Sequence, residues 1–199
     1  MRKNKQQELD SYINELKTNK KEFIDNKGHF ITVERYDCQL NSNKKIIREK
    51  ILKNKNDGSA VIILPVTKDG EVILAIQPRV FTKTTVGIGL PAGYVEKDED
   101  YENAAKRELL EETGYSPEEL IELCSYYQDD GCSGAFNKGY LARNCKQVSE
   151  QKLDKDEFIK YFKCNIDELY ELLDQGYISD GGSQLVIEKS KTYLKKRGN

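Results

Sequence analysis

Hydrophobic residues in the N-terminal segment first recur with a helical period and then alternate with polar ones. Residues 7–24 place a few apolar side chains on one helical face among Lys, Asn and Glu residues. Residues 29–37 and 45–53 alternate instead, and the turn-forming residues 41–43 lie between them. The pattern predicts a peripheral helix followed by a small strand meander.

Two short apolar runs mark the start of the main domain. Residues 60–65 and 71–77 flank Asp69 and Gly70, a pair that favours a tight turn, so they predict a hairpin that enters the core. We therefore expect residues 1–56 to form an N-terminal helix with a small β-sheet, and residues 57–199 to form the main domain.

The rest of the main domain mixes helices and strands. Asp100 can cap a helix that runs to about Thr113, with Gly114 as its stop. Ser116 followed by Glu119 is typical of a capping box and predicts a short second helix. Strands are predicted over 123–128, 138–142 and 158–164, with helices over 165–176 and from about residue 183 onward.

Composition indicates a folded globular protein. The chain has 199 residues, of which 37% are hydrophobic and 33% charged. Its longest apolar run, residues 60–64, is far too short to span a bilayer, and the N-terminus lacks the apolar stretch of a secretion signal. The five cysteines include no C-x-x-C pair, which favours reduced thiols. We expect a cytoplasmic protein without a membrane segment.

Acidic residues are concentrated in one stretch of the chain. The net charge is −2, but residues 96–112 hold eight acids and three bases. Such a cluster on a slightly basic body suits a site for divalent cations and an anionic ligand, although a solvated helix face gives the same pattern. No dominant basic stripe of the kind that binds duplex nucleic acid is present, so we expect no nucleic-acid partner.

Three glutamates in this stretch are spaced to share one helical face. Glu108, Glu111 and Glu112 stand at positions i, i+3 and i+4, where like charges repel each other unless a cation lies between them. Carboxylate oxygens are ligands for Mg²⁺ or Mn²⁺. Arg107 is within one turn of Glu111 and can hold it by a charge-assisted hydrogen bond.

Residues 93–115 also match a longer pattern, G-x5-E-x7-R-E-U-x-E-E-x-G-U, in which U is a bulky aliphatic residue. The fixed positions are Gly93, Glu99, Arg107, Glu108, Glu111, Glu112 and Gly114, and Leu109 occupies the first U position. Only Tyr115, at the last U position, departs from it. On these residues the chain resembles the Nudix hydrolases. The resemblance implies an α/β fold, an α/β/α sandwich with a mixed central sheet, that hydrolyses a nucleoside diphosphate linked to another moiety.

Segments outside the motif resemble the ADP-ribose pyrophosphatase branch of that family. They are residues 90–93, residues 77–79 and the C-terminal run 158–194. The likeness implies hydrolysis of a nucleoside diphosphate-sugar, first of all ADP-ribose to AMP and ribose 5-phosphate. Residues 29–56 resemble the small sheet through which that branch dimerises, so a homodimer is expected. The proline usual in the branch is replaced by residues 129–134, which leaves other ADP-, GDP- or UDP-sugars open.

The resemblance also implies roles for single residues. The Ala92 carbonyl, Glu108 and Glu112 would hold Mg²⁺ or Mn²⁺, with Glu111 as a shared or outer ligand. Arg107 would support them, as would Glu99. A base that orients the attacking water would be Glu157, in the loop before the last strand, or Glu150.

Substrate contacts are predicted from residue type and position. Arg79 has a planar fork that can bind phosphate or ribose, although a surface ion pair is the alternative reading. Phe81 can stack on a base, and Gly131 lies in the loop where the branch's proline is missing. Two other functions stay open: a house-cleaning nucleoside triphosphate pyrophosphohydrolase, and a Nudix domain that senses ADP-ribose without cleaving it.

Overall fold

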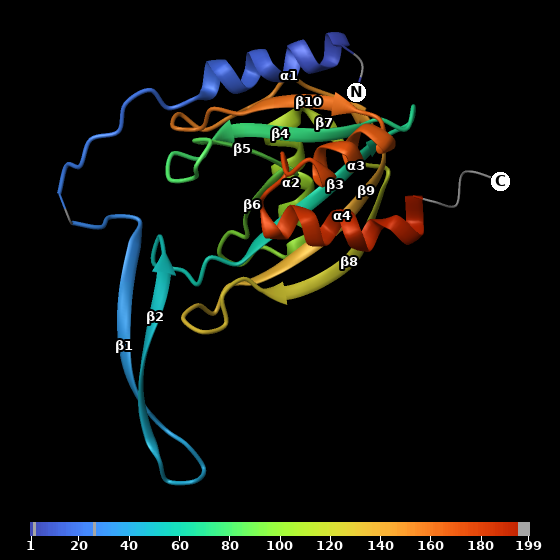
Figure 1. Ribbon diagram of the computed structural model, residues 1–199. Coiled ribbons are helices and arrows are strands. Elements are labelled where there is room, and N and C mark those ends of the chain that lie inside the picture. The colour runs from blue at the N-terminus through green and yellow to red at the C-terminus, as the bar shows by residue number, and fades with distance from the viewer. Residues whose placement is uncertain (2, 26, 195–199) are drawn as a thin grey trace.

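The computed structural model describes residues 1, 3–25 and 27–194, which form a two-stranded hairpin and an eight-stranded sheet covered by helices (Figure 1). In chain order the elements are α1 (Lys3–Leu16), β1 (Ile31–Gln39), β2 (Lys45–Lys53), β3 (Ala60–Thr67), β4 (Val72–Pro78), β5 (Val86–Gly89), β6 (Ala92–Tyr94), α2 (Tyr101–Thr113), β7 (Tyr115–Ser116), β8 (Glu119–Tyr127), β9 (Phe136–Gln147), β10 (Lys160–Cys164), α3 (Ile166–Asp174) and α4 (Gly181–Leu194). Within the described residues, no helix is long and apolar enough to cross a membrane.

The large sheet is mixed and is buried on both faces. Its order is β10-β4-β3-β9-β7, with β5 beside β4, β6 beside β3 and β8 beside β9. Only β3 and β9 run parallel to each other; the other neighbouring strands are antiparallel. Side chains of a strand alternate between the two faces. Ile63 accordingly packs in the core under α2, and Ile62 in the core under α1, α3 and α4. The predicted α/β/α sandwich with a mixed sheet is confirmed.

Both predicted ends of α2 are confirmed. Oδ1 of Asp100 accepts a hydrogen bond from the backbone N–H of Asn103 at 2.9 Å, which caps the first turn. Gly114 adopts a left-handed conformation, with φ of 76°, and its N–H donates to the Leu110 carbonyl. Local sequence therefore fixes the length of the helix that carries the glutamates.

The prediction of a short helix after Ser116 is wrong, because the chain forms β7 and β8 there. Leu120 packs toward the core under α2, and Ile121 packs toward the opposite core, as alternate residues of a strand do. Backbone pairing with the long strand β9 outweighs the local capping pattern. The N-terminal helix is also shorter than predicted: α1 ends at Leu16, and Phe23 is 85% exposed.

The hairpin of β1 and β2 stands away from the large sheet (Figure 1). The two strands predicted over 29–37 and 45–53 are present and pair antiparallel over nine residue pairs. At the base of the hairpin, Ile51 donates its N–H to the Cys132 carbonyl at 2.8 Å. Helix α1 does not accompany the hairpin: it packs on β4 and β10, and its Leu9 is fully buried in the main core.

Candidate active site

The glutamates of α2 face strand β6 and the loop before it. Glu112 is only 3% exposed, and its Oε2 accepts the Ala92 N–H at 3.1 Å. The Glu108 carboxylate lies directly over Gly93, where any Cβ atom would overlap it. Gly93 therefore leaves the space that the Glu108 carboxylate occupies, and its role is not that of a turn residue. Ala92 and the two glutamates thus meet where β6 passes α2.

Arg107 holds the outer part of the acidic cluster. Its Nη1 donates to Glu108 at 2.8 Å and to Glu111 at 3.0 Å. Its Nε and Nη2 donate to the two carboxylate oxygens of Glu99 at 2.9 and 2.8 Å. These hydrogen bonds lower the pKa of Glu99, and in turn they raise the pKa of Arg107. One guanidinium therefore orients three carboxylates. The sequence predicted only its hydrogen bond to Glu111.

Burial shifts the pKa of the two inner glutamates upward. It raises the pKa of Glu108 to about 7, although the hydrogen bond from Arg107 opposes the shift. It raises the pKa of Glu112 well above its ordinary value, and the charge of Glu108 adds to this effect. A divalent cation between them would favour the ionised forms, so the chemistry of this donor set fits a hard metal ion.

The side chains alone do not form a complete metal cage. Within the described residues, no three Asp, Glu, His or Cys side chains converge closely enough to hold an ion. Glu108 and Glu111 both bind Arg107, which draws their oxygens toward the guanidinium. Mg²⁺ is commonly bound by one or two carboxylates, with water and substrate phosphate as its other ligands. The arrangement fits that mode of binding.

Glu157 is brought to the cluster from the loop before β10. Its negative charge contributes to the raised pKa of both Glu108 and Glu112. Its Oε2 accepts the N–H of Asp154 at 3.1 Å, which holds the exposed side chain in a local turn. Glu150 lies exposed beyond β9, beside the helix end at Gly114. Of the two predicted acids, Glu157 is the one whose charge acts on the inner glutamates.

Arg79 reaches toward the cluster from the end of β4. Its Cγ lies 2.6 Å from the point where Gly87 of β5 would carry a Cβ atom, so the side chain crosses the backbone there. Burial raises the pKa of Glu112 and of Tyr94, and the positive charge of Arg79 opposes the rise in both. An exposed guanidinium therefore lies on the side of the site formed by β4 and β5.

The other two predicted substrate residues lie in exposed loops. Phe81 is 88% exposed, and its ring centroid is 5.1 Å from Nζ of Lys21. Gly131 belongs to a turn in which the N–H groups of Cys132 and Ser133 donate to the Asp129 carbonyl. That turn lies beside the base of the hairpin rather than beside the glutamates.

Ser183 is a site residue that sequence reasoning missed. It is 1% exposed in the first turn of α4, and its Oγ accepts the Leu90 N–H at 2.9 Å. Its own N–H donates to Asp180 at 2.7 Å. Ser183 thereby anchors the segment that leads into Ala92. Since 93 residues separate Ser183 from Leu90, no local sequence signal could have identified the contact.

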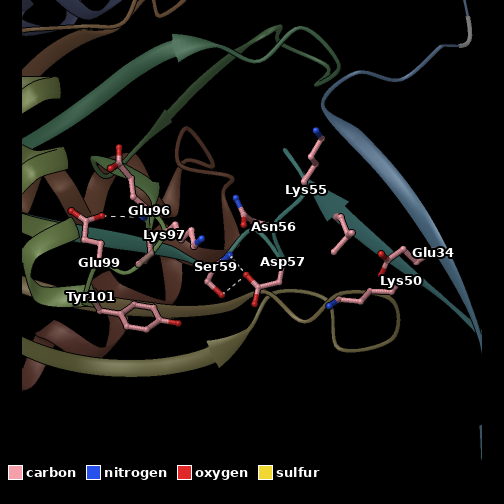
Figure 2. A pocket seen from close by; sticks show the side chains of 12 residues that line it. Glu34, Lys50, Lys55, Asn56, Asp57, Ser59, Glu96, Lys97, Glu99 and Tyr101 are labelled. Atoms are coloured by element: carbon pink, nitrogen blue, oxygen red, sulfur yellow. Dashed lines mark hydrogen bonds between the residues drawn. The ribbon is translucent and has the colours of Figure 1, made fainter.

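A polar cavity of about 590 Å³ adjoins the cluster, between the base of the hairpin and the main domain (Figure 2). Its walls include Glu34 and Lys50 from the hairpin, and Glu99 and Tyr101 near the start of α2. Its volume lies within the range of small-molecule sites. Glu99, which also binds Arg107, joins the cavity to the cluster, whereas Glu108 and Glu112 do not line it.

Comparisons with known proteins identify the family of the chain. The NUDIX domain model matches residues 57–181. The ADP-ribose pyrophosphatase of Bacillus subtilis is 31% identical over 147 residues, 73% of this chain and 77% of that protein. The methanol dehydrogenase activator of Bacillus methanolicus is 28% identical over 65% of this chain and 70% of its own length. A solved structure described as an ADP compounds hydrolase shares the fold, with a TM-score of 0.73 and 20% identity, over 87% of this chain and 91% of that one. The chain therefore belongs to the Nudix family of hydrolases.

Proposed function

We propose that this protein hydrolyses the diphosphate linkage of a nucleoside diphosphate-sugar in the presence of Mg²⁺. ADP-ribose is the leading candidate substrate. The products are AMP and ribose 5-phosphate. The observation that carries the proposal is the buried pair Glu108 and Glu112, packed against Ala92 and oriented by Arg107. The name of the Bacillus subtilis relative supports the choice of substrate.

The metal would be held by oxygen atoms of this cluster. The Ala92 carbonyl, Glu108 and Glu112 are the ligands, and Glu111 is an outer or shared ligand. When bound, Mg²⁺ or Mn²⁺ neutralises the diphosphate and lowers the pKa of the attacking water. The raised pKa of the buried Glu108 supports this assignment, because metal binding replaces a proton on the carboxyl group.

The remaining steps use groups of the chain itself. Glu157, exposed and close enough to act on both inner glutamates, accepts the proton of the water that attacks phosphorus. The bridging P–O bond breaks as the new bond forms, so water is the only co-reactant. Arg79 binds a phosphate or ribose oxygen, and Arg107 positions Glu108 and Glu111. Phe81 and the loop at Gly131, which lies beside the base of the hairpin, would contact the parts of the substrate that extend away from the glutamates.

A panel of nucleotides tests this function. Purified protein with Mg²⁺ is given ADP-ribose, ADP-glucose, GDP-mannose, UDP-glucose, NADH or 8-oxo-dGTP, and the products are separated with and without EDTA. Fastest release of AMP from ADP-ribose, abolished by EDTA, supports the proposal. Preference for 8-oxo-dGTP would replace it with the house-cleaning function. A raised melting temperature with ADP-ribose and no product would replace it with the sensor function.

A second part of the proposal is a homodimer. The Nudix domain of residues 57–199 would carry the reaction, and the hairpin before it would form the dimer interface. A lone two-stranded hairpin is marginally stable in water. Val33 and Ile51 are direct cross-strand partners, so Ile31, Val33 and Ile47 lie on one face with Ile51. Ile31, Val33 and Ile47 are 51%, 60% and 54% exposed. Glu34 and Lys50, on the other face, line the cavity instead. We infer that a second copy covers this face, on which Arg35, Asp37 and Glu49 lie beside the apolar side chains.

Light scattering after size exclusion tests the dimer. The substitution Val33→Lys should shift the protein from dimer to monomer, because it places a charge in the buried interface. Thr32→Lys is the matched control on the opposite face of the same strand, and it should leave the mass unchanged. A monomeric wild-type protein would contradict the dimer without affecting the proposed reaction.

A further inference from the structure

The segment that follows α1 is tied to the loop between β4 and β5. The N–H of Thr18 donates to Oγ1 of Thr85 at 3.0 Å, across 67 residues of sequence. Nζ of Lys21 donates to the Val80 carbonyl at 3.1 Å and lies against the Phe81 ring. Helix α1 itself is fixed on β4 and β10, the neighbouring strands, where Leu9 is buried and Glu15 pairs with Lys160 (Figure 1). The segment therefore runs from an anchored helix to this loop.

The loop contains a backbone conformation that needs support. Thr85 has a φ of +59°, in the left-handed region that β-branched residues rarely adopt. Such a conformation persists only where surrounding contacts specify it. The Thr85 carbonyl accepts the Arg79 N–H at 2.8 Å, and the Arg79 carbonyl accepts both the N–H and the hydroxyl of Thr82 at 2.8 Å. The Thr85 backbone is therefore hydrogen-bonded directly to the Arg79 backbone, next to the pairing of β4 with β5.

Among the described interactions of residues 79–85, only the charge of Arg79 acts on Glu112 of the acidic cluster. Its side chain crosses Gly87, and a change at Thr85 would shift both the Arg79 backbone and the start of β5. Loss of a contact that Arg79 makes equally in the bound state and in the transition state would raise KM and leave kcat unchanged. The loop thus connects the N-terminal segment to substrate binding.

We propose that residues 18–21 form a positioning strap that holds Thr85 in its left-handed conformation and thereby places Arg79 for substrate binding. Thr85 and Lys21 are positioning residues, because they act through Arg79 rather than on the substrate. The inference rests on the proposed function, in which Arg79 binds the phosphate or ribose of a nucleoside diphosphate-sugar. It assigns to the N-terminal segment a role in the reaction distinct from dimerisation.

Two pairs of variants test the strap. Thr85→Val removes the acceptor oxygen at nearly constant shape, whereas Thr85→Ser keeps it. Thr18→Pro removes the donor N–H, whereas Thr18→Ala keeps it. The Val and Pro variants should raise KM for ADP-ribose about three- to tenfold, with kcat within about twofold, as for loss of one hydrogen bond. The Ser and Ala variants should stay near wild type. The double variant Thr18→Pro with Thr85→Val should be no worse than either alone.

Amide hydrogen exchange provides a readout that does not depend on activity. Without substrate, Thr18→Pro and Thr85→Val should speed exchange in residues 79–86 and leave α2 unchanged. Unchanged exchange overturns the strap. Faster exchange with an unchanged KM overturns its role in placing Arg79. If the wild-type protein cleaves no nucleotide, the proposed function fails, and exchange alone decides whether the strap holds the loop.

Discussion

The backbone N–H of Ala92 donates to Oε2 of Glu112 at 3.1 Å, although 20 residues separate them in sequence. This bond joins β6 to α2 at the point where the acidic cluster is most deeply buried. The carbonyl proposed as a metal ligand and the carboxylate proposed beside it therefore belong to one rigid unit.

The contact of Gly93 with Glu108 predicts loss of activity on adding one methyl group. Gly93→Ala would push the Glu108 carboxylate out of place, because the new Cβ overlaps it. We expect kcat to fall by about tenfold or more. The free energy of unfolding should change little, because the displaced carboxylate is the far end of a flexible side chain. Gly181→Ala is the control, since open space surrounds that position. Steady-state kinetics and urea unfolding measure both effects, and wild-type kinetics for Gly93→Ala would contradict the packing argument.

Arg107 is predicted to stabilise the protein more than an exposed ion pair does. Arg107→Lys loses the fork that binds both oxygens of Glu99, and it leaves Glu108 poorly compensated. We expect unfolding free energy to fall by about 2–4 kcal/mol. Lys106→Met, which breaks an exposed pair with Glu102, should cost at most about 0.5 kcal/mol. Equal losses of unfolding free energy for Arg107→Lys and Lys106→Met in chemical denaturation would show that Arg107 stabilises the protein no more than an exposed ion pair.

The raised pKa of Glu108 predicts how pH affects the metal-free protein. The folded pKa is about 7 and the unfolded value is near 4.5, so the folded state binds more protons between those values. The stabilising contribution of Glu108 is therefore full below about pH 4.5, and about 3 kcal/mol of it is lost as the pH rises through 7. Thermal unfolding in EDTA from pH 5 to 8 measures this loss.

Two controls separate this effect from other titrations. Glu108→Gln should reduce the slope and leave the contribution of Glu112, whose pKa is also raised by burial. Saturating Mg²⁺ should abolish the loss, because metal binding favours the ionised carboxylates. A metal-free protein that gains stability from pH 5 to 7 would contradict the assigned direction.

Ser183 is predicted to matter for activity because it anchors the segment before Ala92. Ser183→Ala leaves the buried Leu90 N–H without its acceptor, which should cost about 1–3 kcal/mol and lower kcat. Ser190→Ala is the matched control: it is equally buried on α4, but its hydroxyl bonds only within the helix, to Ile187. It should destabilise without lowering kcat. Equal kinetic effects of the two variants would remove Ser183 from the site.

Local signals were sufficient for the parts of the fold where local and tertiary preferences agree. The caps at Asp100 and Gly114 predict α2 at both ends, and the capping box of Asn165 and Glu168 is present at the start of α3. Ser116 and Glu119 also form a capping-box pattern, which predicted a helix there. It failed because β9 offers a long strand for pairing, which no local signal reports.

The candidate site shows the same limit. Spacing on one helix placed Glu108, Glu111 and Glu112 on one face and Arg107 beside them, because helical geometry is local. The contact of Ser183 with Leu90 and the bond from Thr18 to Thr85 depend on how distant segments pack, so the sequence did not reveal them. Thr85 could have been noticed only from its backbone angle.

The rate of ADP-ribose hydrolysis by Glu112→Gln, with Mg²⁺ present, tests the central claim most directly. The amide can still accept the Ala92 N–H, but it cannot supply a negative charge to a metal ion. AMP release should fall about 100-fold or more while circular dichroism stays unchanged. Glu102→Gln, on the exposed side of the same helix, should keep the wild-type rate. A folded Glu112→Gln protein with a near-normal rate would contradict the account.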